Sequence, residues 1–192
     1  MVGAAEPGIT RDKALALLNE KLAAQPRLIK HCLATEAIMR RLAPRFDANP
    51  DFWGLTGLLH DVDLVEVADD MHRHAAVGAG WLAELGAHPE LVAAVRRHND
   101  ALGEPRTSAL EHALAAAETV TGLIIATALV YPDKKLASVK TKSVAKRYKE
   151  KLFAAGADRA IIAECETIGV PLAEFLELSL QAMTEIAPQL DL

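Results

Sequence analysis

The sequence predicts a nearly all-α protein, a bundle of about eight helices. Alanine and leucine, which are strong helix formers, supply most of an apolar fraction of 51%, whereas aromatic residues make up only 4%. No segment alternates apolar and polar residues for long enough to predict a strand. Residues that cap, open or end helices recur along the whole chain, and they place the individual helices.

The first half of the chain divides into helices at recognisable ends. Thr10 and Asp51 are the expected N-caps of the first and third helices. Pro26 and Pro89 suit the first turn of the second and fifth, and Gly86 suits the end of the fourth. The expected helices cover residues 10–24, 26–43, 51–60, 74–86 and 89–98.

A capping-box pattern opens the longest expected helix. Ser108 is followed three residues later by Glu111, and this helix must stop before Pro132. Its residues 119–131 are thirteen residues without a charge, short of the roughly 20 that cross a bilayer. We therefore expect a buried helix and no membrane contact. The remaining expected signals are C-caps at Gly156 and Gly169, a last helix opened by Pro171, and its end at Pro188.

The length of 192 residues is typical of one domain. We expect a core at residues 26–131 and a C-terminal helical extension at residues 132–192, with the boundary at residues 132–140. The net charge of −5 disfavours broad nucleic-acid binding. Residues 134–151 hold eight basic side chains and one acid, a pattern typical of a solvated helix face that can still meet a phosphate. Tyr148 is the one aromatic residue among them, so no stacking platform for nucleic acid is expected.

Cysteine use and the N-terminal sequence predict the compartment. Cys32 and Cys165 each lie among apolar residues, so we expect two reduced core cysteines. The first ten residues lack a basic stretch followed by an apolar core, and no signal peptide is expected. These features predict a cytoplasmic protein and leave a homo-oligomer open.

The pair His60 and Asp61 is the strongest sign of chemistry. An apolar helix is expected to end at His60, and a carboxylate follows at once. Neighbouring residues do not share a face within a helix, but at a helix end the backbone turns and both side chains can reach one ion. Imidazole and carboxylate together suit Fe, Mn, Co, Ni or Zn, with Mg also possible. The dipeptide is weak evidence alone and needs partners at suitable spacing.

Four segments of the sequence provide such partners. They are KHCLA at residues 30–34, GLLHDVD at 57–63, the stretch from 74 through 78–79 and 85–86 to 97–99, and AETVTG at 117–122. This ordered set resembles the HD-domain metal-dependent phosphohydrolases, in particular the small bacterial HD or HDIG-type proteins. The resemblance covers residues 28–122 for the metal site and extends to about residue 180.

The resemblance implies a first metal ion held by His31, His60 and Asp61. The usual fourth ligand of the family is an aspartate, and Glu118, one methylene longer, stands at the matching position. The alternative for Glu118 is a buried structural acid, which is costly in an alanine-rich stretch unless it is paired.

The resemblance further implies a second ion held by His74 and His98, with Asp61 bridging the two ions. The alternatives are that His74 only begins a helix and that His98 only ends one, where a cation is favourable. The other three histidines rank lower: His72 as a substitute for His74, His88 as a loop or capping residue, and His112 as a structural residue.

A bound divalent cation can lower the pKa of water, orient it and neutralise charge on a phosphate ester. Asp63 is a candidate proton acceptor or partner of a ligand, with a solvent-facing turn residue as the alternative. Arg97, Lys142 and Lys146 are candidate phosphate contacts, or else surface charges. The expected substrate is a small phosphorylated molecule, with nucleotides among the candidates.

Two other functions stay open at this point. HD-fold di-iron oxygenases use six ligands, and the same six side chains could supply them. A non-catalytic regulatory module could instead keep the metal for structure and bind a nucleotide without turnover.

Overall fold

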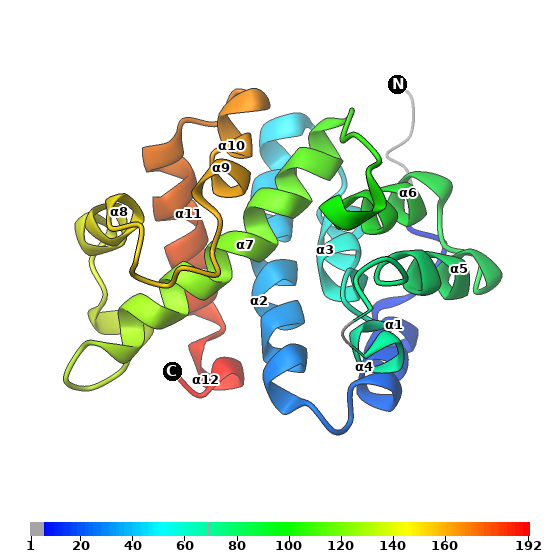
Figure 1. Ribbon diagram of the computed structural model, residues 1–192, viewed down its shortest axis with the longest axis horizontal. Coiled ribbons are helices and arrows are strands. Elements are labelled where there is room, and N and C mark those ends of the chain that lie inside the picture. Colours follow the sequence, from blue (N-terminus) through cyan, green and yellow to red (C-terminus); the bar gives the residue numbers. More distant parts are fainter. Residues whose placement is uncertain (1–5, 69) are drawn as a thin grey trace.

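The computed structural model describes residues 6–68 and 70–192, and within them it contains helices and no strand (Figure 1). The predicted all-α bundle is therefore confirmed. Eight helices have nine residues or more: α1 (Arg11–Lys21), α2 (Pro26–Leu42), α3 (Pro50–Leu59), α5 (Ala76–Glu84), α6 (Pro89–Arg97), α7 (Ala109–Leu129), α8 (Thr141–Lys149) and α11 (Leu172–Glu185). Short helical turns join them: η1 (Ala43–Phe46), α4 (Leu64–Val67), η2 (Asp100–Leu102), η3 (Leu136–Ser138), α9 (Arg159–Ile162), α10 (Glu164–Thr167) and α12 (Ala187–Leu190).

Most of the predicted helix ends are confirmed. Thr10 caps α1, whose first turn donates from the Lys13 amide to the Thr10 hydroxyl at 3.4 Å. Ser108 and Glu111 form the full capping box at the start of α7. Gly169 follows α10 with φ of 79°, a left-handed conformation that suits glycine.

Other predicted helix ends were wrong. The N-cap of α3 is Asn49 and not Asp51, because Pro50 occupies the first helical position and the Asn49 side chain accepts from the next two amides. Gly156 does not cap α8, which already ends at Lys149. Pro188 lies inside α12 and does not end α11. The helix expected from residue 74 begins at Ala76, because Ala75 has φ of 67° and interrupts the helical backbone.

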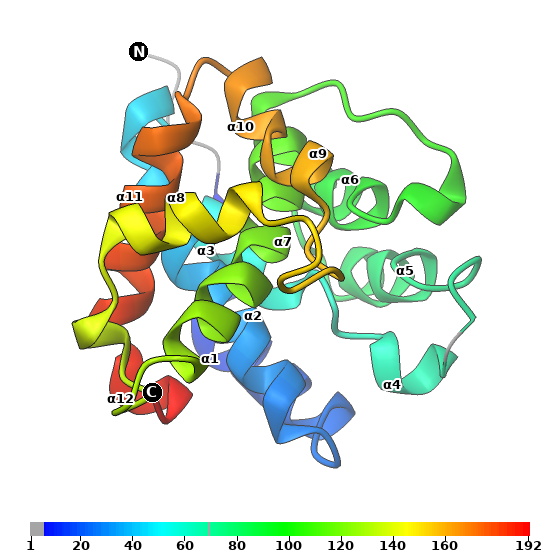
Figure 2. The same cartoon turned by 60° about the vertical axis from the view of Figure 1, so that its left-hand side comes forward.

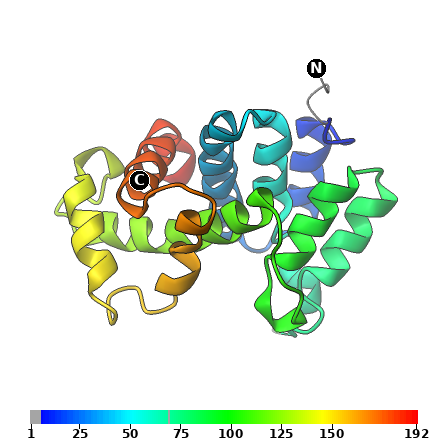
Figure 3. The ribbon, with the colours of Figure 1, turned by 90° about the horizontal axis from the view of Figure 1, so that it is seen from above.

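Helix α7 crosses the middle of the molecule and packs against both halves of the chain. Helices α2 and α3 pack against each other and against α7, with α5 and α6 on one side and α8 and α11 on the other (Figures 1 and 3). The short helices α9 and α10 also pack on α7, as Figure 2 shows. One apolar cluster runs from Ile9 to Leu190, so the C-terminal residues share the core of the N-terminal ones.

Two further sequence expectations concern the core. By length and composition α7 could cross a membrane, but 67% of its most apolar window is buried here, as in the core helix of a soluble protein. Cys32 and Cys165 are both buried and free, as predicted. Burial raises the pKa of the Cys165 thiol to about 12 and that of Cys32 well above its usual value, which makes both thiols unreactive.

Candidate metal centre

The fold brings all six predicted ligands to one place. They come from α2, from the C-terminal ends of α3 and α6, from the turn before α5, and from the middle of α7. Sets of these side chains place their donor atoms within 4.8 Å of one another: His31, His60 and Glu118, and also His60, Asp61 and His98. Elements distant in sequence thus converge on one centre because α2, α3 and α7 share a core.

Asp61 lies between two pairs of imidazoles. Its Oδ2 is 3.5 Å from Nε2 of His31 and 3.4 Å from Nε2 of His60. Its Oδ1 is 3.3 Å from Nε2 of His74 and 3.3 Å from Nε2 of His98. The Nε2 atoms of the first pair, His31 and His60, lie 3.1 Å apart, and those of the second pair, His74 and His98, lie 3.2 Å apart. Each carboxylate oxygen therefore faces its own pair of nitrogen donors.

Each imidazole is fixed from behind through its other ring nitrogen. Nδ1 of His60 donates to the Gly57 carbonyl at 2.8 Å, and Nδ1 of His98 donates to the Val95 carbonyl at 2.6 Å. Because a carbonyl oxygen only accepts, the proton of each neutral ring is on Nδ1, and Nε2 presents a lone pair. Nδ1 of His31 lies 2.9 Å from the Thr121 hydroxyl, which itself donates to the Glu118 carbonyl.

Asp63 fixes the fourth imidazole. Its Oδ1 lies 2.8 Å from Nδ1 of His74, and its Oδ2 accepts from the Gly78 amide at 2.7 Å. Its side chain is fully buried, so the solvent-facing alternative was wrong. Both Asp63 oxygens already have hydrogen-bond partners behind His74. The geometry therefore supports Asp63 as the partner of a ligand over Asp63 as a proton acceptor.

A close helix contact sets the spacing between the first two histidines. A Cβ added at Gly57 would lie 2.9 Å from the Thr35 carbonyl oxygen and 3.0 Å from Met39 Cγ. Only glycine lets α3 approach α2 this closely without a shift. The approach brings His60, at the end of α3, against His31 in α2.

Glu118 faces the His31 side of the centre. Its Oε2 is 4.0 Å from Nε2 of His31, and its Oε1 accepts from the Thr119 hydroxyl at 2.5 Å. Burial raises the pKa of the Glu118 carboxyl above its usual value. The longer side chain thus reaches the His31 side of the cluster, where its oxygen joins His31 and His60 in a set of donor atoms that could hold an ion.

The charges of the cluster are strongly coupled. Burial alone would raise the pKa of Asp61, but His60, His74 and His98 hold it well below its usual value. Burial would likewise lower the pKa of His74, but Asp61 and Asp63 raise it to about 9. Burial and the neighbouring His60 lower the pKa of His31 to about 4, so this ring is neutral at pH 7. The cluster is an anionic carboxylate surrounded by nitrogen donors, a donor set that fits a divalent transition metal.

The three predicted phosphate contacts do not join the centre. Arg97 donates to Glu111 at 2.7 Å and so ties α6 to the capping box of α7. Lys142 is exposed on α8, and Lys146 lines a separate hollow beside Tyr131. Lys142 and Lys146 are thus surface charges, which was the alternative stated for them, and the direction of each of the three side chains depends on how α6 and α8 pack.

The lower-ranked histidines are also placed. His88 caps α6 by accepting from the Glu90 amide, which confirms the predicted capping role. Nδ1 of His112 lies 2.7 Å from a carboxylate oxygen of Glu164, which confirms the predicted structural role. His72 is exposed in the turn before α5.

The centre opens to solvent on one side. The side chains of His31 and Glu118 are 22% and 24% exposed, whereas Asp61, His60, His74 and His98 are exposed by 11% or less. A cavity of about 300 Å³ lies on this side. Helix α7 adds Thr119, Thr121 and Gly122 to its wall, and sequence reasoning missed the part that comes from the distant C-terminal segment: Gly156, Ala157, Asp158 and Ile161.

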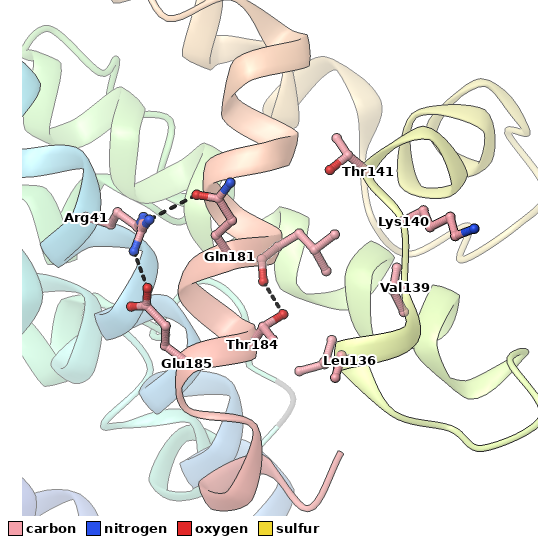
Figure 4. Close-up of a pocket in the computed structure, with 10 residues that line it drawn as sticks. Arg41, Leu136, Val139, Lys140, Thr141, Gln181, Thr184 and Glu185 are labelled. Carbon is pink, nitrogen blue, oxygen red and sulfur yellow. Dashed lines mark hydrogen bonds and ion pairs between the residues drawn. The ribbon is translucent and has the colours of Figure 1, made fainter.

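A larger hollow of about 540 Å³ lies elsewhere, between α11, the end of α2 and residues 136–141 (Figure 4). Its arginine, Arg41, is already paired with Glu185 and Gln181. None of the six clustered ligands lines this hollow.

Comparison with known proteins identifies a family for this chain. The family model described as HD domain matches residues 28–129, just over half of the chain, and these residues contain all six clustered ligands. No curated protein and no solved structure matches the chain.

Proposed function

The chain belongs to the HD domain family, whose members are generally metal-dependent hydrolases, and we propose that it is a phosphohydrolase acting on a phosphate ester of a small molecule. One observation carries the proposal. The Asp61 carboxylate lies between two imidazole pairs, with each oxygen 3.3–3.5 Å from two nitrogen donors. This is the arrangement expected of a carboxylate that bridges two divalent ions.

Under this proposal the residues would divide between two ion positions. His31, His60 and Glu118 would hold one ion, His74 and His98 the other, and Asp61 would contact both. Mixed nitrogen and oxygen donors suit Fe, Mn, Co, Ni or Zn. When bound, such ions would supply a polarised water and positive charge beside the phosphoryl oxygens.

The chain's own residues would pre-organise this centre. Hydrogen bonds that the rings make with Gly57, Val95, Asp63 and Thr121 fix the four imidazoles, so little reorganisation would be needed when metal ions bind. In the proposed hydrolysis, water adds to phosphorus, the ester P–O bond breaks, and the alcohol leaves with a proton. The substrate enters from the His31 and Glu118 side, where the centre meets the cavity.

The proposal is tested by metal analysis of the purified protein together with a panel of phosphate esters. We expect bound transition metal and metal-dependent release of inorganic phosphate, both absent after chelation. The control variant is Glu177→Ala, which removes an exposed charge on α11, far in the chain from the six ligands. Stoichiometric metal with no hydrolysis of any ester would contradict the proposal.

The convergence of six ligands also supports a di-iron oxygenase. Iron content and oxygen consumption separate the two reactions, because a hydrolase consumes no oxygen. Nucleotide binding with neither reaction would identify the non-catalytic regulatory module.

A further inference from the structure

We propose that the cavity beside the centre selects phosphomonoesters whose organic part carries hydroxyl or ammonium groups and disfavours esters with a second phosphate. The inference rests on the proposed function and names its substrate class. Asp158, in the C-terminal part of the chain, is the residue that would determine this preference.

The location of the cavity points to the organic part of the substrate. His31 and Glu118 form one wall, so a phosphoryl group at the ion position nearest them would have its ester group directed into the cavity. A volume of about 300 Å³ is at the small end of ligand-binding pockets. The cavity therefore suits a small organic group rather than a polymer.

The cavity has no cationic side chain among the described residues that line it. Its polar groups are Glu118, Thr119, Thr121 and Asp158, beside His31. Sites that bind di- or triphosphates use lysine or arginine for the additional charges. Here a second phosphate would meet carboxylates, and the interaction between like charges is unfavourable.

Asp158 has an oxygen free for a ligand. Its Oδ1 accepts from the Ala160 amide at 2.7 Å and caps α9. No described residue pairs with its other oxygen, and the side chain is exposed at the cavity. A carboxylate of this kind accepts hydrogen bonds from hydroxyl or ammonium groups.

The neighbouring arginine does not supply the missing cation. Arg159 directs its guanidinium at backbone carbonyls of residues 147–157, and Tyr148 donates in return to the Arg159 carbonyl at 2.9 Å. The accepting carbonyls belong to Arg147, Tyr148, Glu150, Phe153, Ala154 and Ala157. Arg159 thus fixes the segment that precedes Asp158. Because this segment forms part of the cavity wall, the wall is already in place before a ligand binds.

The connection from α8 to α9 crosses over α7 and brings this segment to the centre (Figures 1 and 2). Helix α9 then packs on α7, the helix that carries Glu118. The C-terminal part of the chain therefore supplies the specificity wall, and the first 131 residues supply the six ligands.

A matched substrate pair tests the inference. Metal-loaded protein is assayed with fructose 6-phosphate and fructose 1,6-bisphosphate, which differ by one phosphate, and kcat/KM is compared. We expect the monophosphate to be preferred. Asp158→Asn should reduce this preference about two- to fivefold at low salt, the range expected for an exposed charge interaction. Asparagine still caps a helix, so α9 should remain intact.

The control is Glu166→Gln, which removes an exposed charge of the same part of the chain outside the cavity lining. A wild-type preference for the bisphosphate, or an equal preference in wild type and Asp158→Asn, would overturn the inference. Calorimetric binding of both sugars to metal-loaded protein gives a second readout. If neither sugar is hydrolysed, the proposed function fails, but the ratio of the two binding constants still decides the cavity's preference. If neither sugar binds, the inference about the cavity is overturned.

Discussion

Asp63 and His74 form a buried pair, 2.8 Å apart, in which the carboxylate fixes the ring whose Nε2 faces Asp61. Asp63→Asn tests its role. The NH₂ group of the new asparagine would face either the Gly78 amide, which is also a donor, or Nδ1 of His74. In the second case Nδ1 must accept, so the proton of the neutral ring moves to Nε2. Substitution of a residue that hydrogen-bonds a metal ligand typically lowers metal affinity by about 10- to 100-fold. We therefore expect metal affinity to fall by this factor at the second ion position alone. Calorimetric metal titration measures it, and two unchanged binding steps would contradict it.

Metal binding should release protons near neutral pH. In the metal-free protein Asp61 and Asp63 raise the pKa of His74 to about 9 against the effect of burial, so the ring is charged at pH 7. A ligand imidazole must be neutral, so binding at pH 7 should release about one proton from this residue. The release should fade as the pH rises through 9, and the apparent affinity should increase. Calorimetric metal titrations in buffers of different ionisation enthalpy count the released protons. A binding enthalpy that does not depend on the buffer would refute the predicted proton release.

Glu118 tests the one departure from the usual ligand pattern. Its Oε2 lies 4.0 Å from Nε2 of His31, at the open side of the centre. We expect Glu118→Asp, which shortens the side chain, to change metal affinity or preference, and Glu118→Gln to weaken binding. A purely structural acid would give wild-type metal affinity in both variants with changes in stability only. Metal titration combined with thermal unfolding distinguishes these outcomes.

The close packing of α3 on α2 should matter for both stability and metal binding. Gly57→Ala would place a Cβ 2.9 Å from the Thr35 carbonyl, so α3 must shift. We expect a loss of about 1–3 kcal/mol in the free energy of unfolding, as for other overpacked sites. Metal affinity should also fall, because His60 moves relative to His31.

Gly80→Ala is the matched control, since its added Cβ meets nothing within 4 Å and alanine favours a helix interior. Denaturant unfolding should show Gly80→Ala to be neutral or stabilising. Equal stability of the Gly57 and Gly80 variants would show that the close contact does not matter.

Local chemistry made much of the fold predictable. The capping box at Ser108 and the proline at Pro26 act within one turn, so their helix ends followed from the sequence. The end of α3 was placed correctly, but its N-cap was not, because Asn49 and Asp51 are both good caps and the intervening proline decides between them.

The candidate site was predictable only in part. The six ligands occur in short recognisable segments, and the fold brings them together. The hydrogen bond between Thr121 and His31 joins residues 90 positions apart, and the place of Asp158 in the cavity lining depends on how the chain crosses α7. Such tertiary contacts have no local signal. The exposed lysines of α8 agree with the predicted solvated helix face, whereas their contact with a phosphate stays a prediction.

Asp61→Ala tests whether Asp61, which lies between the two histidine pairs, bridges two ions. The measurement is calorimetric metal titration of the metal-free variant, followed by a phosphate-release assay on the same sample. We expect metal binding at both positions and hydrolysis to be lost together, with lower thermal stability in the presence of metal than for wild type under the same conditions. An Asp61→Ala protein that binds two ions with wild-type affinity and hydrolyses phosphate esters at the wild-type rate would contradict it.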